Sequence, residues 1–482
     1  MIDVKNRVPK YPGRVKMTPV SGQVNIYDME RADDPREEGT PINRELFMQM
    51  QDDIYYHTAP KIGDTLTTMR KDLGDKWLLC NGEYIDPAVY PQLAELCPES
   101  ISVAEFITSN VWGNSTNVNN KINSIAYGDG YWVAGGVYND GSNTHSYIAY
   151  ATSLAGPWTT KSFKIASNSD NESRYLHIDK VIYENGYWVA VGANYVNNQY
   201  VGQMYYTTNL AGEWAEKQLW SSSQGSVDSS VKDITYENGY WVAVGGCRAD
   251  STHQACMAYT TDLAGEWMYK KLWNSNVQQT MATCVKYSNG YWIVGGQLSQ
   301  ITGVAYSTDL AGTFTIKELW GNSNYESKLT GIAEHDGQVV VVGMFRKNSG
   351  DRAAYIAYTS NITGEWTQKE LFSLYEEYCL LTDVIYVNEQ WMASGYKSKS
   401  TTYTAIVMFA ESPDGVWTER ALWDGSTSGE ADCLTFANGM YAFGGIIRKG
   451  STYNAHIAYA DAKYVLPVIT GPAYTYIKAL EG

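Results

Sequence analysis

The side chains best suited to recognise a ligand lie in seven stretches that differ between otherwise similar units of the sequence. Tyrosine rings can stack on the apolar face of a sugar, and arginine can hold a carboxylate or a phosphate through two parallel hydrogen bonds. Basic residues gather in the same stretches of a chain whose net charge is -16. We therefore predict a ligand-binding face with the candidate residues Tyr138, Tyr195, Tyr200, Arg248, His253, Arg346, Arg352, Tyr396, Arg448 and Tyr453. Further basic charge on this face is expected from Lys347, Lys397, Lys399 and Lys449.

The remaining polar residues do not indicate catalysis or metal binding. Six histidines and seven cysteines are scattered, with no CxxC pair, no metal-ligand spacing and no nucleophile motif. We interpret the cysteines as small, buried, apolar side chains. We expect no enzyme, and therefore no catalytic residue, no metal and no cofactor. One possibility stays open, which is a hidden site assembled from Glu172, Asp179, Glu326 or Glu376.

The frame that must hold the variable stretches is a repeat of about 50 residues. A phrase of the form Gly-Tyr-Trp-Val-Ala-Val-Gly-Gly returns seven times, with its central position at Trp132, Trp188, Trp241, Trp292, Val339, Trp391 and Tyr441. A second phrase follows about twenty residues later, such as AYTTDLAGEW, and the seventh copy of it breaks off after Asp461. Because repetition keeps the frame constant, the variable stretches mark the surface that is free to recognise something.

Each unit has the pattern of four short antiparallel strands. In the third unit, Asp233 to Tyr236 leads into a tight-turn signal, and Tyr240 to Val244 is apolar on both faces, as an interior strand is. We expect the pair Gly245-Gly246 where a neighbouring sheet approaches closely. We expect the repeated tryptophans to pack between blades. Seven such units predict a mainly β protein with a seven-bladed β-propeller, and a linear β-solenoid is the alternative.

The unit resembles the repeats of two propeller families. Four apolar residues followed by Gly-Gly, and then Tyr and Trp, are similar to a kelch repeat. The turns that end at Phe314 and Trp417 are similar to the Asp-box of sialidase-type propellers. A sialidase site would need three arginines converging on a carboxylate and a tyrosine activated by a glutamate. The Arg-Ile-Pro triplet of that family is absent, and the arginines of the repeat region lie at variable positions, which argues against such a site.

Residues 105–112 look like a fourth strand with no blade before it. Phe106 and Trp112 have the same spacing as Trp267 and Trp273 in a complete unit, whereas the seventh unit lacks a fourth strand. We therefore predict that 105–112 is the outer strand of the seventh blade. In that position it closes the ring by joining two distant parts of the chain.

The segments outside the repeat resemble parts of phage tail proteins. Tail-collar modules have a Trp-x-x-Cys-[Asp/Asn]-Gly turn before a Tyr-Pro-x-Leu helix, which matches Trp77, Cys80, Asn81, Gly82, Tyr90, Pro91 and Leu93. We expect Asp86 to cap this helix, Pro87 to lie in its first turn, and Val89, Leu93 and Leu96 to share its apolar face. The resemblance implies an attachment segment at 1–60, a small α+β collar-like module at 61–103, the inserted propeller at 104–462, and C-terminal strands at 463–482 that return to the module.

This resemblance implies a receptor-binding protein of a phage tail or phage-like particle, made in the host cytoplasm, located in the virion and generally a homotrimer. Its expected partners are a bacterial surface glycan or wall polymer and other tail or baseplate proteins. The net charge of -16 argues against nucleic acid, and the lack of a long apolar run argues against membrane insertion. Two alternatives stay open: an architectural tail or baseplate component without receptor binding, and a sialidase-like propeller glycosidase that degrades surface polysaccharide.

Overall fold

The computed structural model describes most of the repeat region, over 106–115, 120–167, 176–196, 199–221, 229–249, 252–275, 280–321, 324–348, 351–375, 378–399, 402–423 and 428–464. Elsewhere it describes shorter pieces, 8–9, 15–19, 21, 27–31, 35–37, 65–68, 76–80, 85–87, 89–94, 96–97, 99–100 and 474–479. The chain forms two compact units, one of Met1–Cys97 with Leu466–Gly482 and one of Pro98–Val465. Among these described residues, no helix has the length and apolar character needed to span a membrane.

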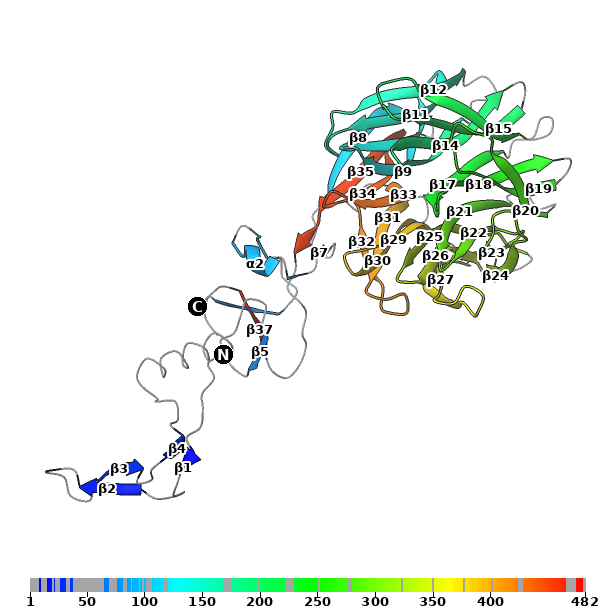
Figure 1. Ribbon diagram of the computed structural model, residues 1–482. Coiled ribbons are helices and arrows are strands. Elements are labelled where there is room, and N and C mark those ends of the chain that lie inside the picture. Colours follow the sequence, from blue (N-terminus) through cyan, green and yellow to red (C-terminus); the bar gives the residue numbers. More distant parts are fainter. Residues whose placement is uncertain are drawn as a thin grey trace. The chain divides into compact units, whose positions relative to one another are not determined.

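The larger unit is a seven-bladed β-propeller, as the repeat predicts (Figure 1). Each of the first six blades is an antiparallel sheet of four consecutive strands. Blades one to three contain β9 (Lys121–Gly128), β10 (Tyr131–Asn139), β11 (Asn143–Ala151), β12 (Thr159–Ser167), β13 (His177–Glu184), β14 (Tyr187–Val196), β15 (Gln199–Thr207), β16 (Ala215–Ser221), β17 (Ser230–Glu237), β18 (Tyr240–Ala249), β19 (Thr252–Thr260) and β20 (Met268–Ser275). Blades four to six contain β21 (Met281–Ser288), β22 (Tyr291–Gln297), β23 (Ile301–Ser307), β24 (Thr315–Gly321), β25 (Ser327–His335), β26 (Gln338–Arg346), β27 (Asp351–Thr359), β28 (Thr367–Tyr375), β29 (Cys379–Val387), β30 (Gln390–Lys399), β31 (Thr402–Ala410) and β32 (Thr418–Ala421).

The seventh blade takes its outer strand from the beginning of the unit. It consists of β33 (Ser428–Ala437), β34 (Met440–Lys449), β35 (Thr452–Asp461) and β8 (Ile107–Ser115). β8 pairs antiparallel with β35, so that Ile107 lies opposite Tyr459 and Ser115 opposite Tyr453. The predicted ring closure is therefore confirmed, with the strand at 107–115 in place of 105–112. Beyond it, β7 (Glu99–Ser100) pairs with β36 (Lys463–Tyr464).

Tight turns and buried aromatics explain why each unit folds into a blade. At the first turn of blade three, Asn238 and Gly239 both have positive φ, 48° and 78°, which is the geometry of a two-residue hairpin. Trp241 is 1% exposed and packs against Val191 of blade two as well as Ala243 of its own blade. The expected packing of the repeated tryptophans between blades is therefore confirmed.

Every first strand carries a β-bulge, and this feature is not visible in the sequence pattern. One residue of the strand is left out of the register opposite the second strand, and across the seven blades these residues are Asn123, Asp179, Lys232, Thr283, Thr330, Thr382 and Asp432. The bulge brings the carbonyl of Ser230 so close to Gly245 that a Cβ there would overlap it, and the equivalent glycine in each blade meets the same obstacle. Our expectation of a close neighbouring sheet is therefore incomplete, because a Cβ at Gly245 would meet this carbonyl of its own sheet as well as the side chain of Trp220 in blade two at 2.9 Å.

Lysines of the outer strands join neighbouring blades. The ammonium groups donate to backbone carbonyls of the turn between the third and fourth strands of the next blade, as Lys161 does to Gly212 and Lys317 does to Gly364 (2.9 Å). In blade six Arg420 takes this place, and its guanidinium lies 5.1 Å from the ring centre of Phe106 beside the closing strand. These contacts tie the outer rim of the ring together.

The smaller unit contains short strands and one short helix. Its strands are β1 (Val8–Pro9), β2 (Val15–Pro19), β3 (Tyr27–Arg31), β4 (Pro35–Glu37), β5 (Thr65–Thr68), β6 (Trp77–Leu79) and β37 (Tyr474–Lys478), and β37 lies between β5 and β6. Helix α2 spans only Pro91–Ala94. The predicted apolar face is wrong, because Leu93 is buried whereas Val89 is 53% and Leu96 is 62% exposed. Most of the predicted attachment segment at 1–60 lies outside the described residues, and so do Asn81 and Gly82 of the collar-like motif.

Candidate functional site

The first strands of the blades contact one another around the ring and surround a central channel. A cavity of about 460 Å³ at one end of this channel is lined by all seven bulge residues, among them Asp179, Lys232 and Asp432. A second cavity of about 430 Å³ lies along the later part of the same strands. Both cavities are lined by Lys180, Ile332 and Asp383, so these residues stand where the two cavities meet.

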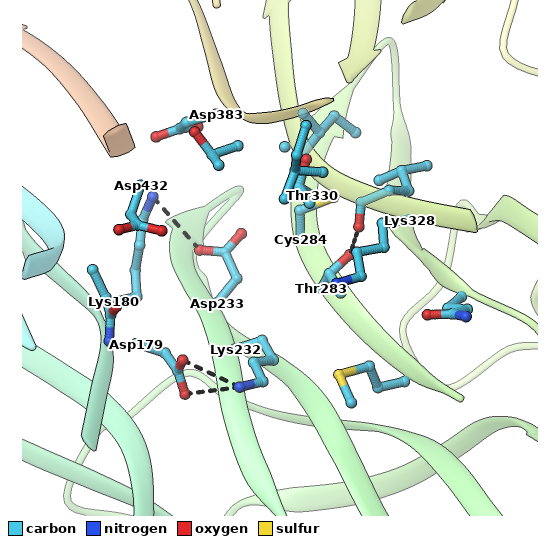
Figure 2. Close-up of a pocket in the computed structure, with 18 of the residues that line it drawn as sticks. Asp179, Lys180, Lys232, Asp233, Thr283, Cys284, Lys328, Thr330, Asp383 and Asp432 are labelled. Atoms are coloured by element: carbon cyan, nitrogen blue, oxygen red, sulfur yellow. Dashed lines mark hydrogen bonds and ion pairs between the residues drawn. The ribbon is translucent and has the colours of Figure 1, made fainter. Parts of the chain in front are cut away.

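Ion pairs between neighbouring blades occupy the first cavity (Figure 2). Lys232 lies 3.2 Å from Asp179, and the same carboxylate lies 2.9 Å from His177. Burial opposes the charge of Asp179, yet these two partners lower its pKa to about 2. Lys121 similarly lies 3.0 Å from Asp432. These contacts use groups on both sides of a blade boundary, which is the arrangement expected of a structural ring.

Lys180 is the central cation of the channel. Its ammonium lies 4.0 Å from Asp233, and the carboxylates of Asp233 and Asp383 raise its pKa although burial works against its charge. Burial raises the pKa of both aspartates. Each carboxylate also accepts a backbone N–H from the next blade, Asp233 from Val285 at 2.9 Å. The positive charge of Lys180 therefore stabilises two partly desolvated carboxylates.

The predicted loop residues lie on the hairpins between the second and third strands. Four pairs of them are cross-strand neighbours: Tyr195 with Tyr200, Arg248 with His253, Arg346 with Arg352, and Arg448 with Tyr453. The structure therefore places eight of the candidates in four separate cross-strand pairs, one on each of blades two, three, five and seven. Tyr138 packs against His145 and Tyr147 of its own blade, with ring centres 5.5 and 5.2 Å away.

Three arginines on these hairpins lie over tyrosine rings. The guanidinium carbons are 5.2 Å from the ring centre of Tyr325 for Arg346, 5.1 Å from Tyr378 for Arg352, and 5.3 Å from Tyr453 for Arg448. Tyr378 also stacks on Tyr396 at 5.8 Å with nearly parallel rings. The Nε–H groups of Arg346 and Arg448 also donate to the backbone carbonyls of Asn348 at 3.2 Å and Gly450 at 3.1 Å, so these arginines are held in place by a ring and by the hairpin backbone.

Other predicted candidates are less accessible. His253 is 5% and Tyr396 is 9% exposed, so these side chains pack within the hairpins and leave little surface for a ligand. Part of the predicted basic charge is also neutralised, because Lys347 lies 2.5 Å from Glu370 and Lys397 lies 2.6 Å from Glu419. The arginines of blades five and seven are thus the cations to consider for binding.

Sequence reasoning predicted Tyr453, the partner of Arg448, but missed the tyrosines that contact the two arginines of blade five. Tyr325 and Tyr378 lie in the connections from the fourth strand of one blade to the first strand of the next. These connections lie on the same face as the variable hairpins, so a search of them for aromatic residues would have found both. The ammonium of Lys328 lies 3.3 Å from the Tyr378 hydroxyl. Lys328 was not predicted because it lies on the first strand of a blade, outside the variable stretches.

Carboxylates at the channel provide the best test of a catalytic interpretation. Two of the four acids considered for a hidden site pair with lysines: Asp179 lies 3.2 Å from Lys232 and Glu326 lies 3.5 Å from Lys328. Glu172 and Glu376 lie outside the described residues. Burial and the carboxylate of Asp432 raise the pKa of Glu430 to about 7. Within the described ranges, no three His, Cys, Asp or Glu side chains come close enough together to hold a metal ion.

Comparison with known proteins supports no assignment beyond the fold. No protein-family model matches the chain, and no curated protein matches its sequence. Among solved structures, the polysaccharide lyase Uly1 is similar over 83% of this chain and 99% of its own, with 11% identity and a TM-score of 0.48. A sialidase of Trypanosoma rangeli covers 77% of this chain and 72% of its own (13%, 0.40), and Sqt1 of Chaetomium thermophilum covers 72% and 97% (9%, 0.38). These neighbours include both enzymes and proteins whose names give no activity, so the function must be argued from the site.

Proposed function

We propose that this chain is a receptor-binding protein of a phage tail or phage-like particle, which attaches to an anionic glycan or wall polymer on the bacterial surface. The observation that carries the proposal is the pair Arg346 and Arg352 on one hairpin, each lying over a tyrosine ring. The collar-like motif around Trp77 and Tyr90 supports the tail assignment. A homotrimer located in the virion and bound to other tail or baseplate proteins belongs to the same proposal.

The chemistry of this surface fits an acidic sugar or a phosphate. Arg346 and Arg352 are cross-strand neighbours on one hairpin, and a guanidinium can donate two parallel hydrogen bonds to a carboxylate or a phosphate. Several copies on one particle would add avidity, which raises apparent affinity by about 10² to 10⁴.

Removal of the two arginine charges should weaken binding of the anionic polymer. Hydrogen bonds to charged groups contribute about 1.5 to 3 kcal/mol each, so Arg346→Ala with Arg352→Ala should weaken binding by roughly a hundredfold or more. Binding of the purified full chain to host cell-wall fragments measures this effect. The matched control removes two lysines from outer strands, Lys164→Ala with Lys271→Ala, and should leave binding unchanged.

Other outcomes would decide between the remaining functions. A purified chain that neither binds host cells nor competes with particle adsorption would favour an architectural component. A chain that shortens isolated surface polysaccharide would be a glycosidase or a related enzyme. If the arginine variant folds and binds as well as the wild type, the proposed surface is not the binding surface.

A further inference from the structure

Blade three contains two cysteines whose sulfur atoms are in direct contact. The Sγ atoms of Cys247 on β18 and Cys256 on β19 are 2.8 Å apart. A disulfide bond is about 2.05 Å long, so a small rotation of either side chain would bring the sulfurs to bonding distance. In the strand register Gly245 lies opposite Cys256 and Cys247 lies opposite Gln254, which makes the two cysteines diagonal neighbours on one face of the sheet.

The surroundings of this pair favour reaction over simple packing. Cys247 and Cys256 are 4% and 0% exposed, but the hydroxyl of Tyr269 lies 3.1 Å from the Cys256 sulfur and 3.6 Å from that of Cys247. Because Tyr269 is itself 47% exposed, the sulfurs lie one side chain below the surface. A hydrogen bond from the Cys256 thiol lowers the pKa of Cys247 although burial opposes this, and Lys271 adds a smaller effect in the same direction. A thiolate is the species that attacks disulfides.

Cys247 is the thiol of the pair that ionises first, because the hydrogen bond to Cys247 and burial raise the pKa of Cys256. For the other buried cysteines of the propeller the pKa is raised and no such partner thiol is in contact among the described residues. Burial raises the pKa of Cys284, Cys379 and Cys433, and the neighbouring carboxylates Asp233 and Asp383 add to the effect at Cys284. These are small apolar side chains of the core, as the sequence pattern predicts, and they provide an internal control.

We propose that Cys247 and Cys256 are a modification site, at which a small-molecule disulfide such as oxidised glutathione converts the two thiols into an inter-strand disulfide. The Cys247 thiolate attacks one sulfur of the small disulfide and releases the first small thiolate. The Cys256 thiolate then attacks the Cys247 sulfur of the mixed disulfide and releases the second. In total one S–S bond forms and one breaks, and the two protons from the protein end on the two small thiols.

The bond would fasten the base of the hairpin that carries Arg248 and His253, two of the predicted binding residues. A reducing cytoplasm keeps such a pair as thiols, and an oxidising exterior favours the disulfide. The hairpin would therefore become more rigid after release from the cell. Release from the cell is part of the proposed function, whereas the reaction of the two thiols does not depend on it.

Trypsin offers a direct test, because Arg248 lies between the two cysteines. Cleavage after Lys232, Arg248 and Lys270 yields the peptides 233–248 and 249–270, each with one cysteine, which stay joined only if the disulfide exists. The full chain is incubated with oxidised glutathione either in the native state or during refolding, free thiols are blocked in acid, and the digest is read by mass spectrometry. The expected result is the joined peptide in both arms, lost after reduction, and accompanied by a slower release of the 233–270 region under limited proteolysis.

Matched variants complete the test. Cys256→Ala should abolish the joined peptide and leave a glutathione adduct on Cys247, whereas Cys284→Ala, which removes an equally buried thiol, should leave the joined peptide unchanged. Recovery of 233–248 and 249–270 as separate, fully blocked peptides in both arms of the wild type would overturn the proposal. A joined peptide in the refolding arm alone would overturn its claim that the folded pair is accessible.

Discussion

Trp112 on the closing strand β8 is the residue whose removal tests the ring most directly. Its side chain is 5% exposed and packs against Ile122 and Trp132 of blade one and Ile457 of blade seven. Its indole N–H donates to the side chain of the fully buried Asn120 at 3.2 Å. Replacement of a buried Trp by Ala costs about 3 to 5 kcal/mol, and the lost hydrogen bond adds about 1 kcal/mol. We therefore expect Trp112→Ala to destabilise the propeller by about 4 to 6 kcal/mol.

Two measurements separate loss of the closing strand from a general loss of packing. Chemical denaturation gives the change in the free energy of unfolding. Hydrogen exchange should show that the amides of β35 which pair with β8, for example near Ala458, lose protection before those of β19 in blade three. Ile107→Ala in the same strand is the control, since Ile107 is 55% exposed and its loss should change stability by about 0.5 kcal/mol or less.

A free energy of unfolding for Trp112→Ala within about 1 kcal/mol of the wild-type value would refute the assigned role of this residue, because the loss of a buried Trp at a ring closure must cost more. Simultaneous loss of protection in β35 and β19 would also refute it. In that case β8 would contribute to the core without acting as the closing element of the ring.

Two further predictions concern charges in the channel. Lys180→Met should lower the free energy of unfolding by about 1 to 3 kcal/mol near pH 7, less than the loss of a fully buried pair, because the Lys180 side chain is 35% exposed. Urea titrations should show that this loss vanishes toward pH 4, where Asp233 and Asp383 take up protons. An equal loss at both pH values would contradict the ion-pair argument. Because the pKa of Glu430 is raised from 4.5 to about 7, wild-type stability should fall as pH rises through that window. Glu430→Gln should therefore match the wild type at pH 4 and be more stable by about 1 to 2 kcal/mol at pH 8, measured by thermal unfolding; no gain at pH 8 would refute it.

The sequence predicted the architecture well because the repeat consists of short-range patterns of residue type. The repeated central position, aromatic in six units and Val339 in the fifth, the turn signals such as Asn238-Gly239, and the matching spacing of Phe106 and Trp112 all act within one unit. Prediction was weaker in the smaller unit, where the expected helix from Pro87 onward is only Pro91–Ala94. A single isolated motif there has no repeats against which its boundaries could be checked.

The candidate site could be predicted only in outline. The arginines of the variable hairpins were found, because variation between units is visible in one chain. The tyrosines that contact Arg346 and Arg352 were not found, since Tyr325 and Tyr378 lie in the connections between blades and only the hairpins between second and third strands were searched. The buried positions of His253 and Tyr396 also depend on neighbouring strands that a linear pattern does not show.

The sequence by itself determined the number of blades, the closure of the ring and the face on which the variable hairpins lie. These features arise from short-range periodicity, which is the same in every blade. Only the tertiary structure decided which side chains enter the channel and which charges meet there. Lys232 and Asp179 are 53 positions apart in the chain, and the equivalent position of the other blades holds Asn, Thr or Asp, so only the circular packing of bulged strands brings this pair within 3.2 Å.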